Sequence, residues 1–359
     1  MTVMLPIVNR EIPIFEDWHV DAGFGSGFVK AARTAAGQRA YTITPFDLLT
    51  VAAFVVFAEA RVDVAVLEVG MGGRWDATSA ADPVAVAITG IGLDHMRILG
   101  DTLGEIAAEK AAVIKPGRIV VLGEGTHEPE VQRVMDERCE ACGVTPLVVT
   151  HEVRELPRHV GDMLAFATAT ERTTYEVRFP KPSYQPQNAA CAIHLVEAYL
   201  GRQLSPASLQ LSLETCPTPG RFDIVRRRPL VLIDACHNPQ SCENFVSALD
   251  EVDEDVSKRP LLLIAALSDK DVSGIVRTLV PAFPRFAVTA TASDRALAPG
   301  ELAQLVAEEL EREGRAPDGL LSVYDTVADA LDALTEAGEP VVAAGTITLA
   351  GEVAGLLRS

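Results

Sequence analysis

The chain has 359 residues, of which 48% are hydrophobic and 23% charged, and its formal net charge is −19. So much apolar sequence can build more than one core, and the length predicts two domains. The negative charge disfavours nucleic acid, whose phosphate backbone it would repel, and no apolar run approaches the length that spans a bilayer. Because the first residues also lack a signal-peptide pattern, we expect a cytoplasmic protein.

In residues 1–217, short apolar runs alternate with amphipathic stretches, which predicts α/β layers. Helices are expected over 28–36, 47–60, 101–114, 128–142 and 187–200, and buried strands over 63–69, 84–89 and 118–123. The stretch 146–180 differs, because its short strand-like runs have no helix between them. We predict a small β-rich appendage there, extending to about residue 185.

Two prolines and a glycine in residues 216–222 predict a linker, and beyond it the βα pattern starts again. Strands are expected over 230–235, 260–267, 285–291 and 340–345, and helices over 240–251, 271–282, 299–313 and 325–336. This alternation predicts a second doubly wound domain. The expected domains are therefore 1–217 and 218–359.

Six cysteines include one C-x-x-C, formed by Cys139 and Cys142 near the end of a predicted helix. No second pair follows at zinc-site spacing, so two ligands are lacking. We therefore expect reduced thiols rather than a metal or redox site.

Charged residues gather where two predicted strands end. Glu68 ends one strand and is followed by a glycine-rich turn, and Asp94 and His95 follow the next strand. Lys110 comes fifteen residues after His95, on a predicted helix. Ligands of open α/β sheets bind at the carboxyl ends of strands, so this pattern is compatible with a metal site. An ion pair beside a capped helix, with Lys110 paired to a nearby glutamate, is the alternative.

Several long blocks resemble the folylpolyglutamate synthase/dihydrofolate synthase family of the Mur ligase superfamily. LEVGMGGRWDATS resembles its LEVGLGGRLDATN signature, and ITGIGLDHMRILGDTLGEIAAEKAAVIKPG resembles the block that follows. Farther on, QPQNAACAI, PGRFDIV, LIDACHNPQS and ALSDKD resemble family segments in the same order. The resemblance covers roughly residues 40–359. It implies an incomplete P-loop NTPase-like domain with the β-rich appendage, and a Rossmann-like glutamate ligase domain.

The resemblance also implies a metal site and its ligands. Glu68 and His95 match the family's magnesium ligands, and Lys110 matches a lysine that CO₂ converts to a carbamate. A carboxylate suits Mg²⁺ in its own right, whereas the histidine ligand rests on the resemblance alone. The implied cofactors are ATP and Mg²⁺, with a second Mg²⁺ or a monovalent cation as a further option.

The resemblance also implies which of the remaining site residues contact ATP, glutamate and the pterin. Asn188, Arg221 and Asp234 match ATP contacts, and a guanidinium suits a phosphate by its geometry. His237 and Asn238 would lie near the glutamate amine, with His237, Lys110 and Asp76 as catalytic residues. The pterin-contacting segment matches Arg74, Trp75, Asp76 and Ala77, where tryptophan replaces the usual leucine.

The family's phosphate-binding loop, G-x-x-G-K-[ST], does not occur in these 359 residues. The early glycine cluster GFGSGFVK at 23–30 lacks the Gly-Lys-Ser/Thr ending, so we expect no phosphate cradle there. Such a loop supplies most of the positioning for phosphoryl transfer, and we expect the chain alone to be inactive. Three hypotheses remain open: a ligase completed by a further or separately encoded N-terminal segment, a degenerate remnant that binds folate or nucleotide weakly, and a Mur-type ligase for another carboxylate.

Overall fold

The computed structural model describes residues 43–93 and 95–358, which form two compact units. The first unit contains the described residues up to Thr150, together with Thr170–Arg172 and Gln187–Gln203. The second contains His151–Ala169, Thr173–Pro186 and the chain from Leu204 onward. The helix expected over 28–36 and the glycine cluster at 23–30 lie outside the described residues. The predicted boundary at 217/218 stays a prediction.

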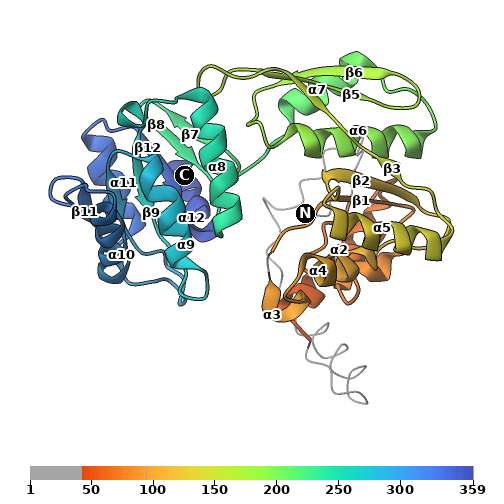
Figure 1. Cartoon of the computed structure of the whole chain (residues 1–359), viewed down its shortest axis with the longest axis horizontal. Helices are drawn as coiled ribbons and strands as arrows, with labels where there is room; N and C mark the ends of the chain where they lie inside the picture. Colours follow the sequence, from red (N-terminus) through yellow and green to blue (C-terminus); the bar gives the residue numbers. More distant parts are fainter. Residues whose placement is uncertain (1–42, 94, 359) are drawn as a thin grey trace. The chain divides into compact units, whose positions relative to one another are not determined.

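The first unit is built on a parallel sheet of order β1-β2-β3 (Figure 1). Its elements are α2 (Pro45–Ala60), η1 (Ala77–Ala81), β1 (Ala85–Gly90), α3 (Met96–Leu99), α4 (Leu103–Ala111), β2 (Ile119–Gly125), α5 (Pro129–Cys142), β3 (Leu147–Val148) and most of α6 (Pro186–Leu200). Capping boxes at Thr44 and Thr102 fix the starts of α2 and α4, because each threonine and a carboxylate three residues on satisfy each other's backbone donors. Strands and helices enclose a core around Ile88, Ile114 and Met135.

The prediction of a strand over residues 63–69 is wrong. These residues form no strand in the part of the chain that the structure describes, and Ala65 and Glu68 are exposed while Leu67 is buried. Among the described strands, β1 pairs with β2 on one side and with nothing on the other. A strand exists only where a neighbour satisfies its backbone groups, so an apolar run alone is not sufficient.

The second unit begins with an antiparallel sheet, β4 (Glu152–Glu155), β5 (Leu164–Ala169) and β6 (Thr174–Phe179), which confirms strands without intervening helices. β3, inside the predicted appendage, instead joins the parallel sheet of the first unit. The helix α7 (Pro206–Thr215), which the sequence analysis did not predict, packs against β6. Gln210 on α7 accepts from the Arg178 backbone N–H at 3.0 Å and donates to its carbonyl at 2.5 Å, so it completes the edge of β6.

A six-stranded sheet forms the rest of the second unit, in the order β11-β10-β9-β12-β8-β7. Its strands are β7 (Asp223–Arg227), β8 (Leu230–Ile233), β9 (Leu261–Ile264), β10 (Phe286–Val288), β11 (Leu321–Val323) and β12 (Val341–Ala344). All pairs are parallel except β7 with β8, and β7 and β11 were not predicted. Both are edge strands in which exposed or half-buried side chains hide the strand pattern.

Helices cover both faces of this sheet (Figure 1). They are α8 (Pro239–Val252), α9 (Val272–Leu279), α10 (Pro299–Arg312), α11 (Val327–Glu336) and α12 (Ile347–Arg358), with short turns η2 (Val256–Lys258) and η3 (Val280–Ala282). One core contains Phe245, Phe283 and Phe286, and the other lies under α11 and α12. The doubly wound prediction is thus confirmed. Among the described residues, no helix combines the length and apolarity needed to cross a membrane.

Candidate active site

The glycine-rich turn after Glu68 lies directly on the helix α4. Gly73 has φ 158°, and a Cβ built there would lie 2.7 Å from Val113 Cγ1 and 3.1 Å from the Glu109 carbonyl oxygen. The next backbone N–H, of Arg74, donates to that same carbonyl at 3.2 Å. Only glycine allows this close approach, which holds the turn against the end of the helix that carries Lys110.

Arg74 and Asp76 both make contacts that fix the turn. The Arg74 guanidinium pairs with Glu109 at 2.8 Å and donates to the Ala108 carbonyl at 3.3 Å. Asp76 Oδ2 accepts from the Met71 N–H at 2.9 Å, and Oδ1 accepts from Thr78, so this carboxylate caps η1 and closes the turn. Both proposed substrate residues therefore already have partners inside the protein.

Trp75 lies between these two residues and points away from the core. Its side chain is 88% exposed, and Ala77 begins η1 immediately after Asp76. The proposed substrate contact of Trp75 stays a prediction.

The three predicted metal ligands lie on three different segments of the first unit. Glu68 is exposed ahead of the glycine turn, and Lys110 is half-buried in the last turn of α4. His95 is exposed and has φ 53°, a left-handed conformation that few non-glycine residues adopt. The described residues contain no group of three or more His, Cys, Asp or Glu side chains placed to hold a metal.

Asp234 accepts three hydrogen bonds through its carboxylate at the second unit's site. It follows β8, is 2% exposed, and its Oδ2 accepts from the Tyr184 hydroxyl at 3.0 Å and the Phe222 N–H at 2.9 Å. Its Oδ1 accepts from the Cys236 N–H at 2.9 Å. Burial raises the pKa of this carboxyl, although its hydrogen bonds and the nearby Arg221 guanidinium oppose that shift. Asp234 therefore ties three separate segments together around the linker.

His237 and Asn238 form the start of α8. Asn238 is the N-cap and accepts from the Ser241 N–H at 2.8 Å, while Ser241 Oγ accepts from the N–H groups of His237 and Asn238. His237 Nδ1 lies 3.0 Å from the Ala235 carbonyl oxygen. A carbonyl can only accept, so this contact assigns the proton to Nδ1 and leaves Nε2 as the basic nitrogen of the neutral ring.

Arg221 and Asn188 complete the predicted ATP contacts. Arg221 is half-buried, close enough to Asp234 to act on its pKa, and its N–H donates to the Thr218 carbonyl at 3.0 Å. Asn188 lies on α6 in the first unit. The structure thus brings Arg221, Asp234, His237 and Asn238 together within the second unit.

Sequence reasoning missed Tyr184 and Ser241. Tyr184 reaches Asp234 across fifty residues, and burial raises the pKa of its phenol far above the ordinary value. Nothing in the local sequence signals such a contact. Ser241, by contrast, follows Asn238 by three residues, a spacing that is typical of a capped helix start.

Comparison with known proteins decides the family. Residues 220–349 match the family described as Mur ligase, glutamate ligase domain. The dihydrofolate synthase/folylpolyglutamate synthase of Mycobacterium tuberculosis is 32% identical over 341 residues, which cover 90% of this chain and 68% of that protein. The chain belongs to the dihydrofolate synthase/folylpolyglutamate synthase family.

Other family members agree with this assignment. The Bacillus subtilis dihydrofolate synthase/folylpolyglutamate synthase is 32% identical over 66% of this chain and 56% of its own length. The crystal structure of the M. tuberculosis folylpolyglutamate synthase complexed with ADP and AMPPCP superposes with a TM-score of 0.81 at 28% identity. It covers 94% of this chain and 80% of that one. The resemblance and the two-domain α/β fold predicted from sequence are confirmed, and the chain spans between 56% and 80% of the length of these relatives.

Proposed function

We propose that this folylpolyglutamate synthase family chain takes part in the ATP-dependent joining of L-glutamate to the carboxylate of folate or dihydropteroate. The observation that carries the proposal is the loop after β8. It holds Asp234, His237 and Asn238 inside the segment that matches a glutamate ligase domain. The relative complexed with ADP and AMPPCP supports ATP as the co-substrate.

The reaction proceeds through an acyl phosphate. The substrate carboxylate attacks the γ-phosphorus of ATP, and ADP leaves. The glutamate amine then attacks the acyl carbon, an amide bond forms, and inorganic phosphate leaves. The attacking nitrogen must lose a proton, and His237 Nε2 is the nitrogen of that ring able to take it, because Nδ1 donates to the Ala235 carbonyl. Asn238 holds the helix start beside it.

Arg221 is the proposed phosphate contact. It lies next to a buried carboxylate, so its guanidinium is held close to the linker while keeping donors for an anion. In this proposal Asp234 mainly positions the segments around it, because both of its carboxylate oxygens already accept hydrogen bonds from protein donors. Asn188, on α6, would make a further contact with ATP.

Mg²⁺ would offset negative charge on the transferring phosphoryl group when bound. Glu68, His95 and a carbamate on Lys110 would hold it. The two oxygen donors suit Mg²⁺, whereas the imidazole rests on the family resemblance. The glycine turn supports this assignment, because its contact with the Glu109 carbonyl holds the Glu68 segment against the helix of Lys110. Arg74, Trp75, Asp76 and Ala77 would contact the pterin from the same turn.

A weakly binding remnant is the second candidate, favoured by the absence of a G-x-x-G-K-[ST] loop from the 359 residues. Phosphate release with ATP, L-glutamate and either dihydropteroate or a folate separates the two. We expect none from the chain as given, and turnover when a family-type phosphate-loop segment is fused to it or added as a second chain. Continued inactivity with that segment would favour the remnant. Turnover with only a different carboxylate would indicate another Mur-type ligase.

A further inference from the structure

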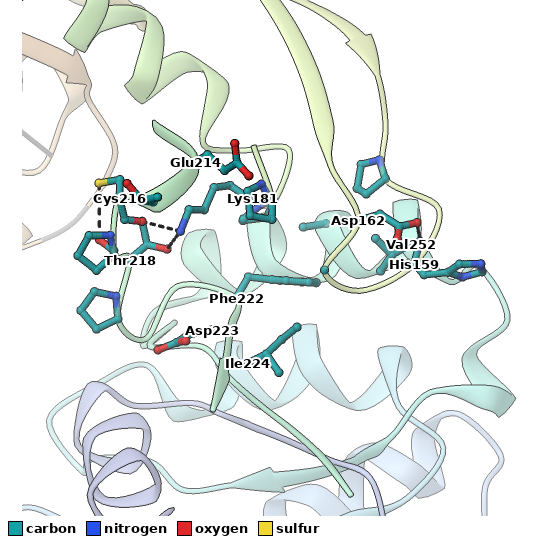
Figure 2. Close-up of a pocket in the computed structure, with 18 of the residues that line it drawn as sticks. His159, Asp162, Lys181, Glu214, Cys216, Thr218, Phe222, Asp223, Ile224 and Val252 are labelled. Carbon is teal, nitrogen blue, oxygen red and sulfur yellow. Dashed lines mark hydrogen bonds between the residues drawn. The ribbon is translucent and has the colours of Figure 1, made fainter. Parts of the chain in front are cut away.

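A cavity of about 330 Å³ lies within the second unit, apart from the residues assigned above to ATP, glutamate and metal (Figure 2). Its walls come from the β4–β5 loop, the segment after β6, the linker before β7, and one turn of α8. Cavities of this size accommodate small organic ligands. Its lining contains a lysine, an arginine, three carboxylates, the ring of Phe222 and several prolines.

Two cationic side chains line this cavity, the exposed Arg227 and the half-buried Lys181, and Lys181 is the one suited to a ligand. Its half-buried ammonium donates to the Cys216 carbonyl at 2.7 Å and to Thr218 Oγ1 at 3.0 Å. Both acceptors are neutral, and no carboxylate of the described residues lies within ion-pair distance of it. An ammonium carries three N–H donors, so one donor and the whole charge remain available to a ligand. A partly desolvated cation gains most from an anionic partner.

The carboxylates that line the cavity already have protein partners. Asp162 accepts from the His159 N–H at 3.0 Å, Asp223 accepts from the Gly220 N–H at 3.2 Å, and Glu214 accepts from Gln210 at 3.3 Å. The lining thus combines two cations with three carboxylates, and Lys181 is the half-buried cation, without a carboxylate partner, that an anionic ligand would meet.

Phe222 gives the cavity a rigid apolar surface. Figure 2 shows its ring between Lys181 on one side and Ile224 on the other. The ring is fixed from behind by Phe245, with centroids 5.8 Å apart and planes at 60°. Prolines 157, 180, 182, 217 and 219 add walls that lose little conformational entropy when a ligand packs on them. A flat apolar body fits such a surface.

We propose that this cavity binds a small aromatic carboxylate. Its carboxylate would accept from Lys181 Nζ, and its ring would pack on Phe222. The same ligand would reinforce the linker, because Lys181 already holds the linker at Cys216 and Thr218.

The test is a titration of the full chain with 4-fluorobenzoate, followed by ¹⁹F NMR. Binding is expected with a dissociation constant of about 1 mM or tighter for a ligand of this size. The neutral 4-fluorobenzamide, and the non-aromatic cyclohexanecarboxylate measured by its displacement of 4-fluorobenzoate, should each bind at least about tenfold more weakly, since each loses one of the two interactions. Equal binding of all three, or none, would overturn the proposal without any variant being made.

Variants then locate the site. Lys181→Met should weaken 4-fluorobenzoate roughly ten- to a hundredfold, because a charge-assisted hydrogen bond is lost. Lys181→Arg should retain most of the affinity, and the control Lys258→Met, at an exposed lysine paired with Asp255, should change nothing. Phe222→Leu should remove the preference for the aromatic over the cyclohexane ring. Unchanged affinity in a folded Lys181→Met chain would place the ligand elsewhere, and the proposal would fail.

Discussion

The two parallel sheets of this protein respond differently to similar apolar sequence. In the second unit, β10, β9, β12 and β8 each have a strand on both sides and helices on both faces, and β9, β10 and β12 are buried throughout. In the first unit, the described β1 has one strand neighbour, and the apolar residues 64–69 form no strand at all. Apolar composition thus produces a strand only where hydrogen-bonding neighbours exist on the sheet.

The same division separates the proposed chemistry. The first unit carries the proposed metal and pterin residues, on turns and on the helix α4, together with the proposed ATP contact Asn188 on α6. The second carries the other proposed phosphate contact and the amine contacts on a buried, hydrogen-bonded frame around Asp234. If this comparison is correct, changes in the first unit should affect turnover, and changes in the second should affect nucleotide affinity or stability.

Lys110→Ala should have the largest effect. In the chain completed with a phosphate-loop segment, we expect ligation to fall at least about a hundred- to a thousandfold, because an anion that positions metal charge is lost. Nucleotide affinity should change little, since the proposed ATP contacts Arg221 and Asp234 lie in the second unit and Asn188 lies on α6, not on the helix of Lys110. A small added carboxylate should partly restore turnover.

Lys115→Ala is the matched control, because Lys115 lies beyond the same helix and pairs with Asp82. It should retain activity. Full activity of Lys110→Ala would contradict the metal assignment, as would the absence of a ¹³C carbamate signal from Lys110 after equilibration with labelled CO₂.

Alanine substitutions of two leucines, one in each unit, test the difference between the sheets through the free energy of unfolding. Leu262→Ala removes a fully buried side chain from the doubly flanked β9 and should lower the unfolding free energy of the second unit by roughly 4 kcal/mol. Leu67→Ala, in the segment without a strand partner, should cost roughly 2 kcal/mol, because its surroundings can collapse more easily.

Thermal and urea unfolding should show two transitions, with the first unit melting first and exposing apolar surface to a dye. Leu262→Ala should move only the later transition, and Leu67→Ala only the earlier one. A single cooperative transition in the unaltered chain would refute the comparison.

Arg221→Ala should weaken ATP binding by about ten- to a hundredfold, the value of one charge-assisted guanidinium–phosphate contact of roughly 1.5–3 kcal/mol. Calorimetric titration measures this. Arg277→Ala, on the exposed side of α9, is the control and should bind ATP as the unaltered chain does. An unchanged titration curve for Arg221→Ala would remove this residue from the nucleotide site.

Glu339→Gln should have the smallest effect. Arg285 contacts Glu339 at 3.2 and 2.6 Å and lowers the pKa of its carboxyl. The pair therefore contributes stability above the ordinary glutamate pKa, and this contribution disappears as the pH falls through the lowered value. Since both side chains are partly exposed, the loss at neutral pH should be under about 1 kcal/mol.

Only the second unit's transition should shift in Glu339→Gln, and the difference from the unaltered chain should disappear as the pH falls through the lowered pKa of Glu339. The nearby Glu336→Gln, which removes a carboxylate without that ion pair, provides the baseline. A difference that persists in acid would mean that packing, not charge, stabilises this position.

The sequence by itself determined the family, the α/β class and most elements of the second unit, because apolar runs of strand length alternate there with amphipathic helices. The family resemblance pointed to His237 and Asn238 as residues near the glutamate amine, and the structure shows that they form the start of α8. It did not reveal the edge strands β7 and β11, whose exposed residues mask the pattern, or α7, which depends on its contact with β6.

Only the tertiary structure decided what depends on distant partners. Residues 63–69 carry a strand's composition but lack strand neighbours among the described residues. The Tyr184–Asp234 hydrogen bond joins residues fifty positions apart, and Lys181 meets the linker carbonyl of Cys216 thirty-five positions on. Local sequence encodes propensity and spacing, whereas hydrogen bonds and charges across such separations exist only once the chain has folded around them.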